Sequence, residues 1–177
     1  MIPSRFGSPK HRGRHAHMDE ERLFNLTQFP DIGLYMDQII SLTETRLKGY
    51  RRNESEKLLT KSMINNYSKD DLLPPSSHKQ YGREHLARIF MIYFLKQILA
   101  IPDVKQIMQW EQEMESSFPA FEEALAGAMK EVSDRVQALP QGDAALHQEI
   151  VNLCVEAYAR KHMVEKLLDT LAKPDPS

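Results

Sequence analysis

Cysteine is almost absent from this chain, which has 177 residues and a single cysteine, Cys154. One cysteine excludes a disulfide framework within the chain and any zinc or iron–sulfur site built from several thiolates, and it fits a reducing compartment. Long apolar stretches are missing too. The longest uninterrupted run, Ile89 to Leu95, has seven residues, whereas a membrane-spanning helix needs ~20. The basic first residues lack the apolar segment of a secretory signal. We therefore expect a soluble, cytoplasmic protein without a membrane partner.

Motifs that carry catalysis are also missing. The sequence has no glycine-rich phosphate loop, no His-Glu-x-x-His and no Gly-x-Ser-x-Gly. His85 follows Glu84 at a predicted helix start, where capping accounts for it. We expect no enzymatic activity, no cofactor and no metal site.

The net charge of −2 hides an uneven distribution along the chain. Residues 46–100 contain eleven Lys or Arg and five Asp or Glu, whereas residues 101–177 contain seven and fourteen. A basic middle beside an acidic C-terminal region suggests two parts with different partners, and a polyanion is a candidate partner for the basic part. Runs of charge are also common on ordinary solvated surfaces, so this pattern alone is weak.

Residues 1–18 contain few apolar side chains and are rich in basic residues, Gly and Pro, so we predict a disordered basic N-terminal segment. Translation starting at Met18 instead of Met1 is the alternative, and the mass of the native N-terminus distinguishes the two.

The remaining sequence predicts a mainly α fold. Leu34, Met36, Ile39, Ile40, Thr43 and Leu47 are spaced as one helical face, with Asp31 as a candidate cap. A polar loop at 49–56 precedes a short helix capped by Thr60. Prolines 74 and 75 then stop that helix and lead into a tight turn at 76–82. The helix from Arg83 is apolar around most of its circumference and should be central to the core, and another helix restarts near Pro102.

One stretch, Leu59 to Leu95, combines several of these features: LTKSMINNYSKDDLLPPSSHKQYGREHLARIFMIYFL. A capped short helix is followed by a Leu-Leu-Pro-Pro corner, a polar turn ending on a tyrosine, and a helix opening with Arg-Glu-His-Leu. This order resembles the MerR-type winged helix-turn-helix. More closely, about Pro30 to Met108 resembles an uncharacterised bacterial domain-of-unknown-function family, DUF1836, with a MerR-like N-terminal part. The resemblance implies a winged helix-turn-helix DNA-binding domain at 30–115, double-stranded DNA as partner and transcriptional regulation as function.

The resemblance also implies which residues contact DNA. Thr60 to Lys69 becomes the recognition helix, where an Asn amide can bond an adenine edge and a Lys can neutralise a phosphate. The implied contacts are Lys61, Ser62, Asn65, Asn66, Tyr67 and Lys69 on this helix, Ser77, His78, Lys79 and Tyr81 on the wing, Arg83 after it, and Arg51 and Arg52 before the helix. MerR-type helices usually carry Arg and Tyr where this chain has Asn65 and Asn66, so a different base preference is expected.

The C-terminal region, 116–177, has the apolar spacing of two long helices. Leu125, Met129, Val132, Val136 and Leu139 form one series, and Leu146, Ile150, Leu153, Ala157, Arg160, Val164, Leu167 and Leu171 form another, both with alternating intervals of four and three. The break at Pro140 to Asp143 predicts an antiparallel helical hairpin. Either the two seams pack on each other and on the N-terminal helices, or they pair with a copy of the chain as a homodimer. Cys154, beside the second seam, is expected to be buried.

Two further alternatives stay open at this point. The helix-turn-helix and the acidic hairpin can instead form a protein–protein interaction module without DNA binding, since a fold does not determine function. Met114, Phe118, Phe121 and Met129 can line either an effector pocket or a core. As a symmetric dimer, the DNA-binding alternative would present two recognition helices ~34 Å apart or a multiple of that.

Overall fold

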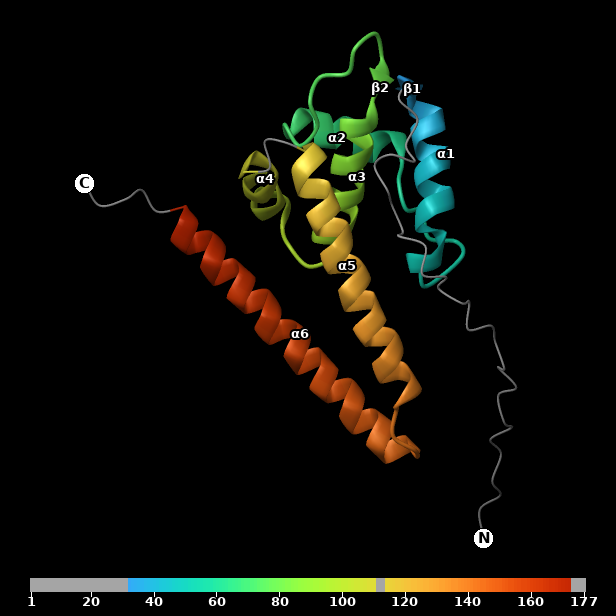
Figure 1. The fold of residues 1–177 in the computed structure, drawn as a ribbon, viewed down its shortest axis with the longest axis vertical. Coiled ribbons are helices and arrows are strands. Elements are labelled where there is room, and N and C mark those ends of the chain that lie inside the picture. The colour runs from blue at the N-terminus through green and yellow to red at the C-terminus, as the bar shows by residue number, and fades with distance from the viewer. Residues whose placement is uncertain (1–31, 111–113, 173–177) are drawn as a thin grey trace, which may run out of the picture.

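The computed structural model describes residues 32–110 and 114–172, which form a helical body and a long two-helix arm (Figure 1). In chain order the elements are β1 (Leu34–Tyr35), α1 (Met36–Leu47), the 3-10 helix η2 (Lys48–Tyr50), α2 (Lys61–Lys69), β2 (Gln80–Tyr81), α3 (Arg83–Leu95), α4 (Ile101–Trp110), α5 (Met114–Gln137) and α6 (Asp143–Leu171). The predicted mainly α fold is confirmed. The predicted segment 1–18 and the candidate cap Asp31 lie outside the described residues.

The first helix begins later than the apolar spacing predicts. Leu34 belongs to β1, which pairs antiparallel with β2 so that Leu34 faces Tyr81 and Tyr35 faces Gln80. A Cβ at Gly33 would lie 2.7 Å from the Gln80 Cβ, so glycine is required for this approach of the two strands. The helix starts at Met36, and the Gln38 side chain accepts a hydrogen bond from the Tyr35 amide. Ile39, Thr43 and Leu47 are its buried face.

The short helix α2 forms as predicted and ends by a specific backbone arrangement. The Thr60 hydroxyl accepts a hydrogen bond from the Met63 amide, which caps the N-terminus. At the other end Asp71 has a φ of 57°, and the Leu72 amide bonds back to the Tyr67 carbonyl at 2.8 Å. This Schellman-type closure ends the helix before the chain reaches Pro74. The prolines therefore shape the following corner instead of stopping the helix.

The helix α3 is the centre of the body. Seven of its apolar side chains are buried, on all sides of the helix: Leu86, Ala87, Ile89, Phe90, Met91, Ile92 and Tyr93. They pack with α1, α2, α4 and the first turns of α5, where Met114 and Phe118 are buried. Phe121 lies beside both Phe94 and Phe118 in an aromatic group. Met114, Phe118 and Phe121 are thus core residues, and α5 begins as part of the body.

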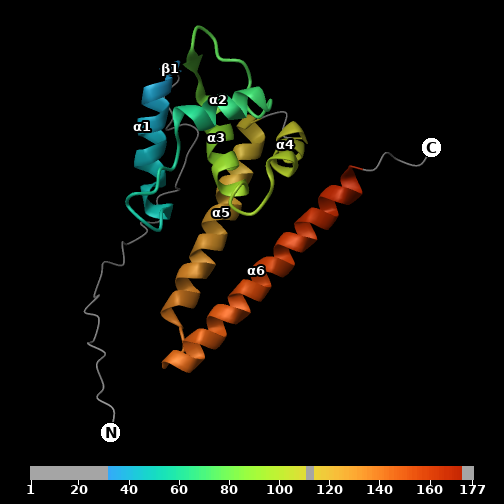
Figure 2. The ribbon, with the colours of Figure 1, turned by 180° about the vertical axis from the view of Figure 1, so that it is seen from behind.

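Beyond the body, α5 continues and α6 returns at an angle to it, so the two helices diverge from the turn that joins them (Figures 1 and 2). The turn contains Gly142, whose φ of 93° suits glycine. The C-terminal end of α6 reaches α4, where the Gln106 side chain donates to the Leu168 carbonyl at 3.2 Å and Leu168 is buried. The predicted helical hairpin is confirmed, but its seams do not pack on each other along their length.

Several apolar positions of the arm are exposed in the single chain. Cys154 is among the exposed residues, so its predicted burial is wrong: it lies on a part of α6 that no other described segment of this chain covers. The seam residues Ile150, Leu167 and Leu171 are exposed as well. Among the helices of the described residues, none is both long and apolar enough to cross a membrane.

Candidate nucleic-acid interface

The helix α2 has one buried and one exposed face. Ile64 and Tyr67 are buried against the body. The opposite face carries polar and basic side chains with no carboxylate among them: Lys61, Ser62, Asn65, Asn66, Ser68 and Lys69 are all exposed. Two amides and two lysines stand on this face, and amides bond base edges while lysines bind phosphates. The predicted division of this helix into core and exposed residues is confirmed.

Tyr67 fastens α2 to the body. Its side chain is 5% exposed, and the Lys96 ammonium lies over its ring at 6.0 Å from the centroid. Burial raises the pKa of the Tyr67 phenol to about 12, and burial lowers the pKa of the Lys96 ammonium, which Glu56 opposes. The sequence predicts Tyr67 as a DNA contact, but its position makes it a residue that orients the helix from behind.

The turn between the Pro-Pro corner and α3 forms a very short hairpin. Ser77 bridges to Gln80, and the Gln80 amide donates to the Ser77 carbonyl at 2.8 Å. Between them His78 and Lys79 have φ values of 50° and 62°, and both side chains are exposed. Positive φ at both central positions is the property of type I′ turns, which normally use Asn and Gly there. A histidine and a lysine occupy the tip despite the conformational cost.

His85 joins this hairpin to the corner that follows α2. Its Nδ1 accepts a hydrogen bond from the Gly82 amide at 3.1 Å, which fixes the start of α3. Its Nε2 lies 3.1 Å from the Pro74 carbonyl, so the neutral ring donates there. The ring also meets the buried Tyr81 edge to face at 5.3 Å between centroids. His85 therefore holds the hairpin and the corner in one fixed arrangement, a role beyond the capping predicted for it.

Ion pairs surround the exposed face of α2. Lys61 pairs with Asp37 at the start of α1, at 2.7 Å, and both side chains are largely exposed. Asp71, after the end of α2, pairs with Lys105 of α4 at 3.1 Å. Asp37 and Asp71 thus place negative charge at two edges of the face, and Asp37 competes with any phosphate for Lys61.

Arg51 and Arg52 lie apart from the other predicted residues. Both arginines follow η2, at the C-terminal end of α1. The hairpin strand β2 pairs with β1, which directly precedes the N-terminal end of α1. The two ends of this twelve-residue helix are ~18 Å apart. The Arg51 guanidinium is also engaged, since it pairs with Glu44 at 2.7 Å and donates to the Glu54 carbonyl. Glu44 in turn accepts from the Leu58 amide. Arg51 therefore fixes the loop that leads into α2, while Arg52 is exposed.

The structure brings most of the predicted residues to one end of the molecule. Figures 1 and 2 show α2 and the loop before β2 at the end of the body opposite the turn between α5 and α6. The predicted contacts that are exposed at this end are Lys61, Ser62, Asn65, Asn66, Lys69, Ser77, His78 and Lys79, and we call them the α2–hairpin face. Tyr35, Asp37, Asp70 and Asp71 are exposed beside them. Tyr81 is buried beneath this face, and Arg83 is half-buried at the start of α3.

A family model for a domain of unknown function, DUF1836, matches residues 24–125 of this chain. The chain belongs to the DUF1836 family. The matched region covers the whole described body, including α2, the hairpin and the first turns of α5. No curated protein and no solved structure matches the chain. The family carries no assigned function, so the chemistry of the residues must supply it.

Sequence reasoning missed two residues that shape the α2–hairpin face. Asp37 lies twenty-four residues before Lys61, and no local pattern in the sequence predicts that the two form an ion pair. The sequence predicts the capping role of His85, because a polar residue three positions after a glycine can cap a helix. Its hydrogen bond to the Pro74 carbonyl could not be predicted, because it forms only in the folded corner.

Across the described residues, no three His, Cys, Asp or Glu side chains gather as metal ligands.

Proposed function

We propose that this DUF1836 protein is a sequence-specific DNA-binding regulator of transcription. In this proposal its body is a MerR-like winged helix-turn-helix, with α2 as recognition helix and the Ser77–Gln80 hairpin as a minimal wing. The observation that carries the proposal is the exposed face of α2, where Asn65 and Asn66 stand between Lys61 and Lys69 without a carboxylate. The helix is nine residues long, short enough to lie in a major groove with its exposed side chains toward the base edges.

The assigned roles follow from the side chains. Asn65 and Asn66 donate to and accept from base edges, since a carboxamide matches the paired acceptor and donor of adenine. Lys61 and Lys69 bind phosphates on either side of the groove. His78 and Lys79, at the hairpin tip, contact the sugar–phosphate backbone beside the groove. Arg51 takes no part in this proposal, because Glu44 and the Glu54 carbonyl already hold it.

The test is a fluorescence-anisotropy titration of the full chain, after enrichment of bound sequences from random duplexes. The double variant Asn65→Ala/Asn66→Ala should bind the enriched sequence and an unrelated duplex about equally, because each bidentate amide supplies about 1–3 kcal/mol of discrimination. Gln148→Ala/Asn152→Ala is the matched control, since it removes a hydrogen-bonded amide pair from α6 and should keep full preference.

Salt dependence tests the lysines separately. Lys61→Ala and Lys69→Ala should each lower affinity for all sequences, and each should reduce the slope of log K against log salt by about 0.9, the value for one phosphate that is no longer neutralised. Lys130→Ala, on α5 and far along the arm, is the matched control and should leave the slope unchanged. Absence of binding to any duplex near 0.1 M salt refutes the proposal. A protein that co-purifies through the same face would then favour the interaction-module alternative.

A further inference from the structure

The helix α6 is apolar on two opposite sides. Its inner stripe is the seam predicted from the sequence, which Arg160 interrupts with a charge: Leu146, Ile150, Leu153, Ala157, Arg160, Val164, Leu167 and Leu171. Its outer stripe contains Val151, Val155 and Tyr158, which lie across the helix from the inner one at 3.6 residues per turn. In the single chain Ile150 and Leu167 are 59% and 57% exposed, and Val155 and Tyr158 are 61% and 69% exposed. A helix that is apolar on all sides is normally buried by neighbours.

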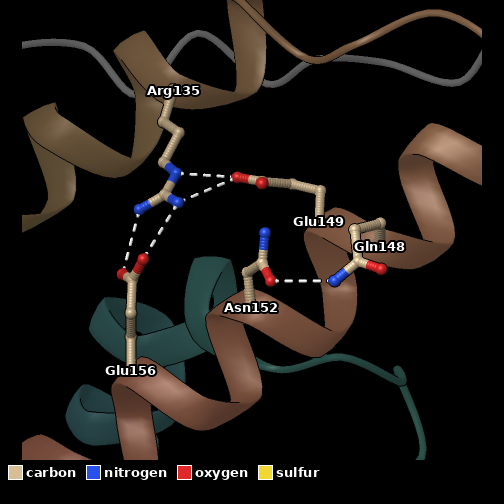
Figure 3. Close-up of polar contacts among 5 residues, drawn as sticks. All are labelled: Arg135, Gln148, Glu149, Asn152 and Glu156. Carbon is tan, nitrogen blue, oxygen red and sulfur yellow. Dashed lines mark hydrogen bonds and ion pairs between the residues drawn. The ribbon is translucent and has the colours of Figure 1, made fainter.

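The contacts of α6 within its own chain cover Leu146 and Val164 of the inner stripe in part and leave the other named residues of both stripes exposed. Near the turn, Arg135 of α5 bonds both Glu149 and Glu156 of α6, as Figure 3 shows, at distances of 2.9 to 3.2 Å. At the other end Leu168 and Val164 pack against the body. Between these two attachments α5 and α6 diverge (Figures 1 and 2). The arm is therefore positioned by polar contacts near the turn and by α4 at its end, while most of its apolar residues face solvent.

The arm carries most of the exposed apolar side chains of the described residues. Eleven of the fifteen large apolar side chains that are exposed there lie on α5, α6 and their turn. Those of the inner stripe, Ile150, Leu153, Leu167 and Leu171, follow one line along α6. A line of exposed apolar side chains along one helix face is the pattern of a helix–helix interface.

The charges along α6 indicate what kind of partner fits. The first half of the helix, 143–157, carries Asp143, Glu149 and Glu156 and no Lys or Arg. The second half, 158–171, carries Arg160, Lys161 and Lys166 against two carboxylates. Arg135 of the same chain already pairs with Glu149 and Glu156, so the first half keeps a smaller negative surplus and the second half a small positive one. A second α6 laid antiparallel brings these opposite surpluses together, whereas a parallel one brings like charge together. The midpoint, Ala157, lies on the inner stripe and has a side chain small enough for two helices to approach there.

We propose that a second copy of this chain covers the arm, so that α5 and α6 of two protomers form one four-helix bundle about a two-fold axis near Ala157. The inner stripes of the two α6 helices meet antiparallel at the axis. The exposed Val132 and Val136 of α5 add apolar surface to the same arm. The inner stripe is then buried, which neither attachment within one chain achieves, whereas the outer stripe lies on the side of α6 that points away from the axis. This assembly follows from the arm alone and does not depend on DNA binding.

The first test is the mass of the full chain by analytical ultracentrifugation at about 1–50 µM. We expect a dimer. Ile150→Asp/Leu167→Asp should weaken association about 100-fold or more, because it places charge in the centre of a buried interface. Both side chains are exposed in the single chain, so the variant should keep its helical circular dichroism. Ala159→Glu, on an exposed part of α6 between the stripes, is the matched control and should remain dimeric.

The second test fixes the orientation by disulfide formation between engineered cysteines in a Cys154→Ser background. Antiparallel α6 helices centred near Ala157 bring Ala157→Cys close to its copy, whereas the two copies of Ile150→Cys lie ~21 Å apart along the axis, far beyond disulfide range. An equimolar mixture of Leu153→Cys and Arg160→Cys chains, at two positions that are exposed in the single chain, should form a mixed disulfide instead. Efficient bonding between two Ile150→Cys copies would overturn the antiparallel arrangement.

A monomer at all concentrations, or a ladder of larger assemblies, would overturn the proposal. In the monomeric outcome the stripes belong to a different protein. The result is separable from that of the DNA titration, because a monomer can still bind one duplex site and a dimer can fail to bind any.

Discussion

The hairpin tip permits a prediction in which stability and function change in opposite directions. His78 and Lys79 both adopt positive φ, at 50° and 62°, in a turn closed by the 2.8 Å bond between the Gln80 amide and the Ser77 carbonyl. Their side chains are exposed, so they add little packing that offsets the conformational cost. The double substitution His78→Asn/Lys79→Gly installs the pair that type I′ turns favour most.

The magnitude follows from the backbone. The left-handed region costs an ordinary residue roughly 1–2 kcal/mol, whereas glycine is free of that cost and asparagine bears less of it. We expect the variant to be more stable by about 2 kcal/mol, which corresponds to a rise of about 4–8 °C in Tm for a chain of this length. Chemical denaturation followed by circular dichroism measures the free energy of unfolding directly.

DNA binding should change the other way. Removing Lys79 takes away one phosphate contact per chain, so affinity should fall for every sequence and the salt slope should fall by about 0.9. Sequence preference should survive, because Asn65 and Asn66 remain. The same anisotropy titration that tests the recognition helix measures all three quantities.

Asp71→Gly is the matched control, because Asp71 also has a positive φ, 57°, outside the α2–hairpin face. Its ion pair with Lys105 is mostly exposed on the Asp side and contributes little to stability. This variant should therefore gain stability without losing DNA affinity, since it also removes a negative charge from the edge of the face. A tip variant that is no more stable would refute the argument from backbone strain. A tip variant that is more stable but binds DNA like the natural chain would refute the role of the hairpin as a wing.

Three other predictions follow from ion pairs and a buried phenol. Asp37→Asn should raise DNA affinity a few-fold in the same titration with stability changed by less than about 1 kcal/mol, because it frees Lys61 from an exposed pair; weaker binding would contradict this. Tyr67 has its pKa raised from 10.0 to about 12 in the folded chain, so stability present below pH 10 should decline by about 2–3 kcal/mol by pH 12, and Tyr67→Phe should lose less in alkaline denaturation. Arg135 holds the pKa of the Glu156 carboxyl below its usual range, chiefly through their hydrogen bond. The stabilisation that this pair gives the folded chain is therefore complete above the pKa that Glu156 has in the unfolded chain. It is lost as the pH falls through the lower pKa that Glu156 has in the folded chain. The protection of amides in the first half of α6, measured against their intrinsic exchange rate at each pH, should then fall in acid, and Arg135→Gln should abolish that fall.

The local elements could be predicted from the sequence because their signals are local. The Thr60 cap and the apolar α3 depend on neighbours within one or two turns, and both are as predicted. The position of Leu34 could not be predicted, because its spacing fits the following helix and only pairing with Tyr81, forty-seven residues later, places it in a strand.

The α2–hairpin face was predictable in its chemistry but not in its surroundings. Which side of α2 faces out follows from its amphipathic spacing. The ion pair of Lys61 with Asp37 and the bond of His85 to the Pro74 carbonyl join residues that meet only after folding. In the arm, apolar residues at intervals of four and three predict an apolar helix face. They do not predict whether that face packs inside its own chain or on another one. This is why the sequence predicts a buried Cys154 although the structure has it exposed.

The two ends of the molecule differ in a way that separates the two proposals physically. The α2–hairpin face is basic and polar, and it has no large exposed apolar patch among its described residues to attract a protein. The arm is the reverse, since it is rich in carboxylates and exposes large apolar side chains. Phosphate repels the acidic arm, so DNA has one end to approach. An apolar partner fits the arm better than the α2–hairpin face. On that face it would remove the exposed lysines and amides from water without offering them hydrogen bonds. A nearly neutral net charge thus conceals two chemically different surfaces, which α3 and α5 connect.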